Sequence, residues 1–292
     1  MNTENTSAKK GKKNSQAKEI WRRFRKNKTA MLGLILLIII LCIAIFADLI
    51  VPYETAITQT PDRKMPPCAQ HLFGTDELGR DLFARIIHGS RYSLAIGIST
   101  TVFSMIIGGL LGAIAAYYGG WVDNIIMRIT DIVMTVPPIL LSLAVVAALG
   151  ANLRNLLIAM TVSCVPGIIR MVRSVVLGVA DEDYIEAARS YGASDMRIIL
   201  KYIIPNALGP IIVTATMNVA SMILSASGLS FLGMGVQPPS PEWGALLSSA
   251  ETYMFDAPYM LYIPGIFIVI SALSFNLAGD GLRDALDPKL KN

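Results

Sequence analysis

Long stretches of apolar residues without a single charge constrain the fold of this chain more than any other feature. Positions 93–117, for example, contain no Asp, Glu, Lys or Arg. A transmembrane helix needs about 20 mainly apolar residues to cross the hydrocarbon core. Charged residues make up 16% of the 292 residues, compared with about 25% in a typical soluble domain. The sequence therefore predicts an all-α integral membrane protein.

We expect six transmembrane helices, because six stretches reach the required length. The first stretch begins late for a cleaved signal peptide and no convincing small-residue cleavage site follows it, so we interpret it as a retained anchor. The six stretches cover approximately residues 30–50, 93–117, 127–149, 156–176, 207–234 and 257–277.

Basic residues cluster immediately before the first stretch, where only Glu4 and Glu19 oppose them. Cytoplasmic segments of membrane proteins carry an excess of Lys and Arg, so the cluster places the N-terminus in the cytoplasm, where it can contact anionic lipid. We prefer this interpretation to nucleic-acid binding, because the basic residues are not spread over the chain. Segments 51–92 and 235–256 then face outward. The cluster comprises Lys9, Lys10, Lys12, Lys13, Lys18, Arg22, Arg23, Arg25, Lys26 and Lys28.

This topology divides the chain into four parts. Residues 1–28 form a basic cytoplasmic tail, and residues 29–92 contain the first helix and an extracytoplasmic loop. Residues 93–282 form a five-helix core with a cytoplasmic loop at 179–205, and residues 283–292 form a cytoplasmic C-terminal tail. The expected localisation is the cell membrane, crossed several times, with both termini in the cytoplasm.

Small residues and prolines interrupt two of the predicted helices. Gly108, Gly109 and Gly112 give the small-xxx-small spacing that is typical of closely packed membrane helices. Pro137 and Pro138 lie within the third stretch, where each removes a backbone donor. They predict a kink or a local unwinding, and a kinked helix can also act as a gate.

Polar residues inside the predicted helices are costly in lipid and therefore raise the question of function. Arg128 and Asp131 are spaced i, i+3, which predicts a local ion pair on one helix face. We interpret Asn218 as a hydrogen-bonding contact between helices. Arg170 and Arg173 are expected to anchor their helix at the interface rather than to bind an anion.

The loop between the fourth and fifth stretches has the most informative pattern. Acidic residues at 181–183 favour a helix N-terminus, and Gly192 suits a left-handed C-terminal stop. Ser194 can cap a second helix, which Pro205 would end before the chain re-enters the membrane. Two short helices meeting at Gly192 predict a compact helical knob at the cytoplasmic face.

This loop resembles the cytoplasmic loop of permease subunits of binding-protein-dependent ABC importers. Their signature is Glu-Ala-Ala, three residues, Gly, nine residues, then Ile-x-Leu-Pro. Here Tyr202 and Ile204 replace the Ile and Leu of the signature and keep its apolar bulk. The residues that match at the required intervals are Glu186, Ala187, Ala188, Gly192 and Pro205.

Three further segments are similar to one branch of that family, the second permease of dipeptide, oligopeptide and nickel importers. They are residues 72–81 (LFGTDELGRD), 236–244 (VQPPSPEWG) and 279–288 (GDGLRDALDP). The resemblance covers nearly the whole chain from about residue 17 onward. Four motifs in the correct order make it specific, whereas a lone Glu-Ala-Ala triplet would not.

The resemblance implies a type I ABC importer permease in which the loop 179–205 couples the membrane helices to an ATPase. It further implies four kinds of contact: a homologous second permease subunit, two ATPase subunits, an extracytoplasmic solute-binding protein and membrane lipid. Short peptides would be the first expectation for the transported solute, and nickel or a metal chelate the second. The chain would form half of the translocation path.

No cofactor or catalytic residue is expected in this chain. It has no Gly-x-x-x-x-Gly-Lys-[Ser/Thr] phosphate-binding loop, so ATP hydrolysis is expected in the partner subunits. His71 and His88 are not part of a recognisable metal-ligand pattern, and we interpret them as ordinary loop or interface residues. No Ser/His/Asp arrangement stands out, and three cysteines do not form a disulfide framework.

Two alternatives belong to other classes of protein. An ion-coupled secondary carrier would need broken helices with coupling carboxylates near the midplane, and the sequence offers only Asp131, near a helix end. A membrane-embedded enzyme would need several carboxylates at one membrane face. The inward-facing acidic residues lie instead in the matched loop.

Overall fold

The computed structural model describes residues 16–180 and 182–286, and these residues form helices with no strand among them. Most connections are short, but residues 58–81 and 232–242 form longer segments between helices. The helices are α1 (Gln16–Phe24), α2 (Lys28–Ile45), α3 (Ala47–Ile50), α4 (Tyr53–Ile57), α5 (Leu82–Tyr118), α6 (Gly120–Met134), α7 (Pro138–Leu149), α8 (Leu153–Ala180), α9 (Asp183–Ser190), α10 (Asp195–Ile198), the π-helical η1 (Ile199–Ile203), α11 (Ile204–Phe231), α12 (Trp243–Ala250), the 3-10 turn η2 (Glu251–Tyr253) and α13 (Tyr259–Leu286).

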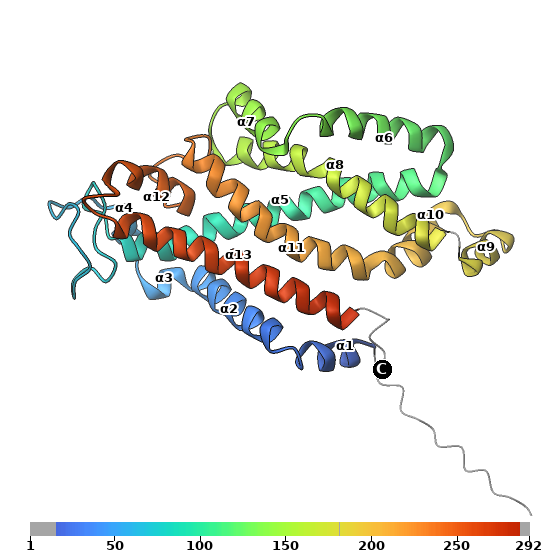
Figure 1. The fold of residues 1–292 in the computed structure, drawn as a ribbon, viewed down its shortest axis with the longest axis horizontal. Coiled ribbons are helices and arrows are strands. Elements are labelled where there is room, and N and C mark those ends of the chain that lie inside the picture. The colour runs from blue at the N-terminus through green and yellow to red at the C-terminus, as the bar shows by residue number, and fades with distance from the viewer. Residues whose placement is uncertain (1–15, 181, 287–292) are drawn as a thin grey trace, which may run out of the picture.

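The long helices run roughly along one axis of the molecule (Figure 1). Within the described residues, five helices are long and apolar enough to span a membrane, and the bent pair α6–α7 makes a sixth span when it is counted as one. The helices α9 and α10 lie at one end of the bundle and α4 and α12 at the other (Figure 1). The predicted orientation names the first of these the inner end and the second the outer end. The all-helical fold and its apolar spans are as predicted.

The helix α5 begins at Leu82, well before the predicted start at residue 93. Asp81 caps it by accepting a hydrogen bond from the backbone N–H of Ala84 at 2.8 Å. The basic side chains of its first turns have polar partners: Arg91 Nε, for example, donates to the carbonyl of Ala44 at 2.6 Å. Because these basic side chains have partners, α5 can begin before the apolar stretch and include a polar extension at its N-terminal end.

Glycines of α5 lie against α8, as their spacing predicts. A Cβ atom added to Gly112 would be 2.6 Å from the carbonyl oxygen of Ile169, and one added to Gly108 would be 2.8 Å from the Cβ of Ile168. Gly109 faces open space. Two of the three glycines therefore allow close approach of the helices, and the third does not serve that purpose.

The third predicted span is broken rather than continuous. Its first half, α6, begins at Gly120 and ends at Met134, and α7 begins at Pro138 with an 83° change of direction. Pro137 has the extended backbone of an N-cap, and Pro138 occupies the first turn of α7, where a missing N–H costs nothing. The predicted kink at this pair is confirmed, and it is sharp enough to make two helices.

The outer segments form a polar structure that the sequence did not predict. Asp76 accepts from Arg80 Nε at 2.6 Å and from Arg85 Nη1 at 2.7 Å, and all three side chains are almost fully buried. The α12 helix is anchored by the buried Trp243, whose Nε1 donates to the carbonyl of Ile86 at 3.0 Å. Burial raises the pKa of Glu242, the N-cap residue of α12.

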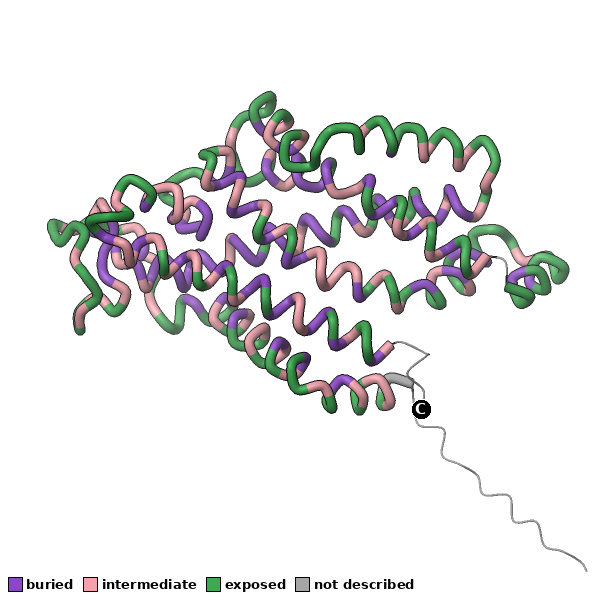
Figure 2. The backbone as a smooth tube through the Cα atoms, in the orientation of Figure 1, coloured by how far each residue is buried: buried purple, intermediate pink, exposed green. Residues whose placement is uncertain are grey.

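Apolar packing is strong along α5, α8, α11 and α13. It is weak on α6, where Thr130 is the only buried residue, and Figure 2 shows this helix as largely exposed. One buried cluster joins α2, α5, α11, α12 and α13 near the outer end. Another joins α5 and α8 to the segment from α9 to α11. The bundle thus has a well-packed interior and one lightly covered helix.

Candidate coupling site

The loop between α8 and α11 folds into a helical knob, as its sequence predicts. Its first helix, α9, starts after the extended residue Glu182 and has Asp183 and Glu186 in its first turn. Acidic side chains at this position are stabilised by the partial positive charge of a helix N-terminus. Burial, followed by the Glu182 carboxylate, raises the pKa of Tyr184 above its ordinary value.

The helix α9 ends in a left-handed turn at Gly192. This glycine has φ of 74°, a conformation that residues with a Cβ rarely adopt. The backbone N–H of Ala193 donates to the carbonyl of Ala188 at 3.1 Å, which is the 6→1 bond of a Schellman motif. The prediction of a positive φ at Gly192 is confirmed, and this turn sets the angle between α9 and the next helix.

The second half of the knob differs from the expectation. Ser194 is the N-cap residue of α10, but its side chain makes no capping hydrogen bond. Pro205 does not end a helix: it lies in the first turn of α11, directly after the π-helical η1. The N–H of Ile204 donates to the carbonyl of Ile199, five residues back. This wider turn lets the chain accommodate Pro205 and continue into the membrane.

The base of the knob is apolar and packs against the bundle. Ile185 of α9, Ile198 of α10 and Ile203 of η1 are fully buried. They belong to one cluster with Val172 and Val176 of α8. Fully burying an aliphatic side chain contributes about 1.5–3 kcal/mol. These residues therefore hold the knob to the inner ends of the membrane helices.

Polar contacts at the edge of the knob link it to α5. The hydroxyl of Tyr117 donates to Asp195 Oδ1 at 2.6 Å. The guanidinium of Arg189 lies over the ring of the same tyrosine, 5.0 Å from its centroid. Tyr117 thus contacts both short helices of the knob, one on each side of Gly192.

The outer crest of the knob is exposed and partly apolar. Tyr191 is 90% exposed and Met196 is 65% exposed. Of the five residues that match the signature, Ala188 is buried, whereas Glu186, Ala187, Gly192 and Pro205 are exposed. Among the described residues, the Glu186 carboxylate has no hydrogen-bond or ion-pair partner. The structure places Glu186 and Gly192 in the knob, and Pro205 at its junction with the membrane.

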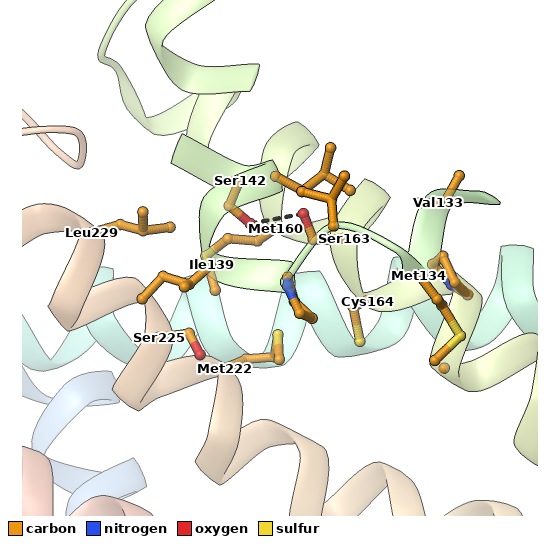
Figure 3. Close-up of a pocket in the computed structure, with 15 residues that line it drawn as sticks. Val133, Met134, Ile139, Ser142, Met160, Ser163, Cys164, Met222, Ser225 and Leu229 are labelled. Carbon is orange, nitrogen blue, oxygen red and sulfur yellow. Dashed lines mark hydrogen bonds between the residues drawn. The ribbon is translucent and has the colours of Figure 1, made fainter. Parts of the chain in front are cut away.

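The kink at Pro137 and Pro138 lies apart from the knob and borders a cavity of about 250 Å³. Side chains from α7, α8 and α11 line it, and Ser142 donates to Ser163 at 2.8 Å across one wall (Figure 3). Met160 and Met222 make its surface largely apolar. Pro138 lines this cavity.

Ion pairs join α6 to α8 and differ from the predicted pairing. Asp131 does not pair with Arg128 on its own helix but with Arg170 of α8, at 2.6 Å. Arg173 makes two contacts of 2.5 Å with the Asp123 carboxylate. The two arginines are therefore interhelical partners rather than interfacial anchors, because the broken α6 brings its acidic residues against α8.

The predicted role of Asn218 as a contact between helices is supported by geometry. Its Nδ2 lies 3.2 Å from the Cys164 sulfur, which connects α11 to α8. The three described cysteines are free thiols.

The six spans and the helical knob beyond them are the architecture of a multi-pass transport subunit. The chain belongs to the family of binding-protein-dependent transport system inner membrane components, which it matches over residues 108–292. Residues 15–67 also match the N-terminal transmembrane domain of oligopeptide transport permease C. The protein is thus a permease subunit of an ABC importer, as the motif in the loop predicts.

Curated relatives match nearly the whole chain. The dipeptide transport system permease protein DppC of Alkalihalophilus pseudofirmus is 46% identical over 275 residues, covering 94% of this chain and 90% of that relative. The di/tripeptide transport system permease protein DppC of Pseudomonas aeruginosa is 44% identical over 284 residues, covering 95% and 94%. The glutathione transport system permease protein GsiD of Escherichia coli is 46% identical over 274 residues, covering 94% and 90%.

A solved structure shares the fold. The MetNI methionine ABC transporter in an inward-facing conformation matches with a TM-score of 0.58 and 22% identity, covering 70% of this chain and 96% of that chain. This likeness supports the type I permease fold. Membership of the family favours an ABC permease over the ion-coupled carrier and the membrane-embedded enzyme.

Proposed function

We propose that this chain forms half of the translocation path for short peptides that an extracytoplasmic binding protein delivers. The relatives named for dipeptides, di/tripeptides and glutathione support peptides over the nickel or metal chelate that the motifs alone left open. All three relatives are similar over at least 94% of this chain, so the resemblance includes the outer segments as well as the membrane helices.

A homologous second permease would complete the path, and two ATPase subunits would hydrolyse ATP outside this chain. The exposed face of α6 supports this assembly. Ile125, Ile129 and Ile132 are exposed along it, and α6 buries little against its own bundle. Exposed apolar surface of this extent is suited to contact with lipid or with another membrane subunit.

The coupling role falls to the knob in the loop 179–205. The observation that carries this proposal is the contrast between its buried base and its exposed crest, where Tyr191 is 90% exposed. A rigid element held at its base can transmit movement of an attached ATPase to α5, α8 and α11 as a rigid-body shift. Glu186 and Ala187 would contact the ATPase, Ala188 would pack inside the knob, and Gly192 would set its angle.

Replacement of Gly192 by Val tests the coupling role. A β-branched residue strongly disfavours the φ of 74° at this position, so the knob should be misaligned. We expect Gly192→Val to reach the membrane but to lose ATPase co-purification and peptide transport. Gly192→Asn is the matched control, because Asn tolerates the left-handed region, and it should retain most of both. Normal transport by Gly192→Val would refute the assignment.

Removal of the Glu186 charge should have a smaller effect on the same two measurements. The side chain is exposed, and an exposed ion pair or hydrogen bond to a partner contributes about 1 kcal/mol or less. Glu186→Gln should therefore retain more ATPase than Gly192→Val. The reverse order would indicate that the carboxylate, rather than the shape of the knob, determines docking.

The proposed orientation places the knob and both termini in the cytoplasm. A membrane-impermeant thiol reagent applied to intact cells should then label Cys68, in the outer segment. A cysteine introduced by Ser190→Cys in α9 should react only after permeabilisation, because α9 lies at the opposite end of the bundle (Figure 1). Labelling of Ser190→Cys in intact cells would reverse the orientation.

A further inference from the structure

The ion pair between Arg170 and Asp131 is unusually exposed for charges on membrane-spanning helices. The Arg170 side chain is 51% exposed and the Asp131 side chain 59% exposed. Charged side chains on such helices face a protein interior or a water-filled cavity rather than lipid, because lipid cannot solvate them. This face of α6 and α8 therefore borders water or protein.

A second ion pair between the same helices is a natural comparison. The Arg173 guanidinium and the Asp123 carboxylate form a bidentate pair, with side chains 29% and 17% exposed. Bidentate pairs of this kind are geometrically specific and comparatively strong. This pair is suited to holding α6 on α8, whereas the exposed pair can exchange partners with little loss.

The exposed pair lies one helical turn from the cavity at the break between α6 and α7. Asp131 and the cavity residue Met134 are three positions apart on α6, and the cavity residue Gly167 and Arg170 are three positions apart on α8. Residues with this spacing share a helix face. The apolar cavity and the ion pair are thus neighbouring parts of one surface.

A further cation lies on the same face. Arg128 is exposed one turn before Asp131, and it has no ion-pair partner among the residues that the structure describes. The surface therefore presents two guanidinium groups and one carboxylate beside an apolar cavity of about 250 Å³. That volume is slightly below the range of about 300–1,000 Å³ that is typical of ligand pockets, so it suits a side chain rather than a whole peptide.

We propose that Arg170, Asp131 and Arg128, together with this cavity, form a transient binding site for a zwitterionic short peptide inside the translocation path. The peptide carboxylate would contact the two guanidiniums, the ammonium group would contact Asp131, and one apolar side chain would enter the cavity. This inference rests on the proposed function in peptide import. It adds a site in the membrane helices that is separate from selection by the binding protein.

The test uses the complete importer in proteoliposomes, with binding protein added at the outer face and a dipeptide of two apolar residues as the probe. Transport and ATP hydrolysis are measured per assembled complex. Arg170→Gln should lower transport at least about tenfold while hydrolysis stimulated by the loaded binding protein stays within about twofold. Asp123→Asn is the matched control, because it removes the structural pair: it should lower thermal stability and leave transport per assembled complex within about twofold.

The double variant Asp131→Arg, Arg170→Asp separates binding from structure. It allows an ion pair between α6 and α8 but exchanges the positions of the two charges. If the site binds peptide, the assembled complex that carries the double variant should transport the dipeptide at least about tenfold more slowly than the parent complex. Full transport by this variant would mean that the pair is structural and would overturn the proposal, as would full transport by Arg170→Gln.

Occupancy can be read separately at Cys164, which lines the cavity. In a Cys42→Ser, Cys68→Ser background, the dipeptide at millimolar concentration should slow maleimide labelling of Cys164 in the inward-facing complex. The Arg170→Gln variant should lose this protection. Absence of protection in the parent complex that does transport the peptide would refute the site alone. Absence of peptide transport by the parent complex would instead refute the proposed function, and this site with it.

Discussion

The two ends of the bundle are held together by different interactions. At the outer end, Asp76, Arg80 and Arg85 form a charged network that is almost fully buried. At the inner end, the knob rests on buried isoleucines, and its polar contacts lie at the surface. One end therefore has a polar interior, and the other an apolar base with a polar edge.

This difference indicates which end can act as a movable unit. Removing one partner of a buried charge pair costs much stability, so the outer network holds the loop before α5 firmly to the start of α5. The apolar base of the knob contains no buried charge among the described residues, so the knob can open locally without leaving a buried charge unpaired. We therefore expect damage at the outer end to affect the whole fold and damage at the inner end to stay local.

The largest effect is expected for Asp76→Asn. The carboxylate accepts hydrogen bonds from two guanidinium groups and from the backbone N–H groups of Leu78 and Arg80. Arg85 would lose its carboxylate partner and Arg80 would keep only Glu77, so the substitution should cost about 3–5 kcal/mol. Thermal unfolding of the purified importer complex and the yield of folded protein should both fall sharply.

Asp48→Asn is the control for this substitution. Asp48 pairs with Arg91 at 2.8 Å, but its side chain is 62% exposed, and an exposed pair contributes about 0–1 kcal/mol. The unfolding temperature of the Asp48→Asn variant should stay close to that of the parent protein. If Asp76→Asn behaved like Asp48→Asn, the buried network would not be the basis of outer-end stability.

The next effect is expected for Ile185→Ala in the knob. Removing a fully buried isoleucine side chain costs about 2–5 kcal/mol. Hydrogen exchange should accelerate in residues 182–203 and remain unchanged at the outer end, because the knob can open without the membrane helices. Met196→Ala, at an exposed position, should leave hydrogen exchange unchanged. Faster exchange throughout the protein after Ile185→Ala would contradict the comparison.

The smallest effect is expected for Tyr117→Phe. This substitution removes the hydrogen bond to Asp195 but keeps the ring beneath Arg189, so it should cost about 1 kcal/mol. Hydrogen exchange of α10 should rise modestly. Tyr118→Phe, next to it in the chain and more than half exposed, should have no effect. Equal effects of the two would mean that the polar edge does not restrain the knob.

The spans and the knob could be predicted because their signals are local. An uncharged stretch of sufficient length, a glycine after a short amphipathic helix and acidic residues at its start each act within a few residues. The positive φ at Gly192 followed from the same local reasoning and is confirmed. The choice of residues that contact an ATPase rests on the motif and stays a prediction.

The features in which the structure differs from the prediction depend on partners that are distant in the sequence. The early start of α5 needs Asp76 and the carbonyl of Ala44 to satisfy its basic side chains. Asp131 pairs with Arg170 because α6 packs on α8, which spacing along one helix does not reveal. Pro205 continues a helix because a π-helical turn precedes it. A proline alone does not disclose that turn.

The helix α5 connects the two ends of the bundle as a single long helix. Its 37 residues make one unbroken rod of about 55 Å, nearly twice the thickness of the hydrocarbon core. The buried Arg85–Asp76 contact clamps one end, and Tyr117 touches the knob at the other. These two contacts are 32 residues apart on α5, about 48 Å along the helix axis, so a tilt of about 5° about the first would displace the second by about 4 Å. A small rotation of α5 at the outer end would thus move its contact with the knob by several ångströms.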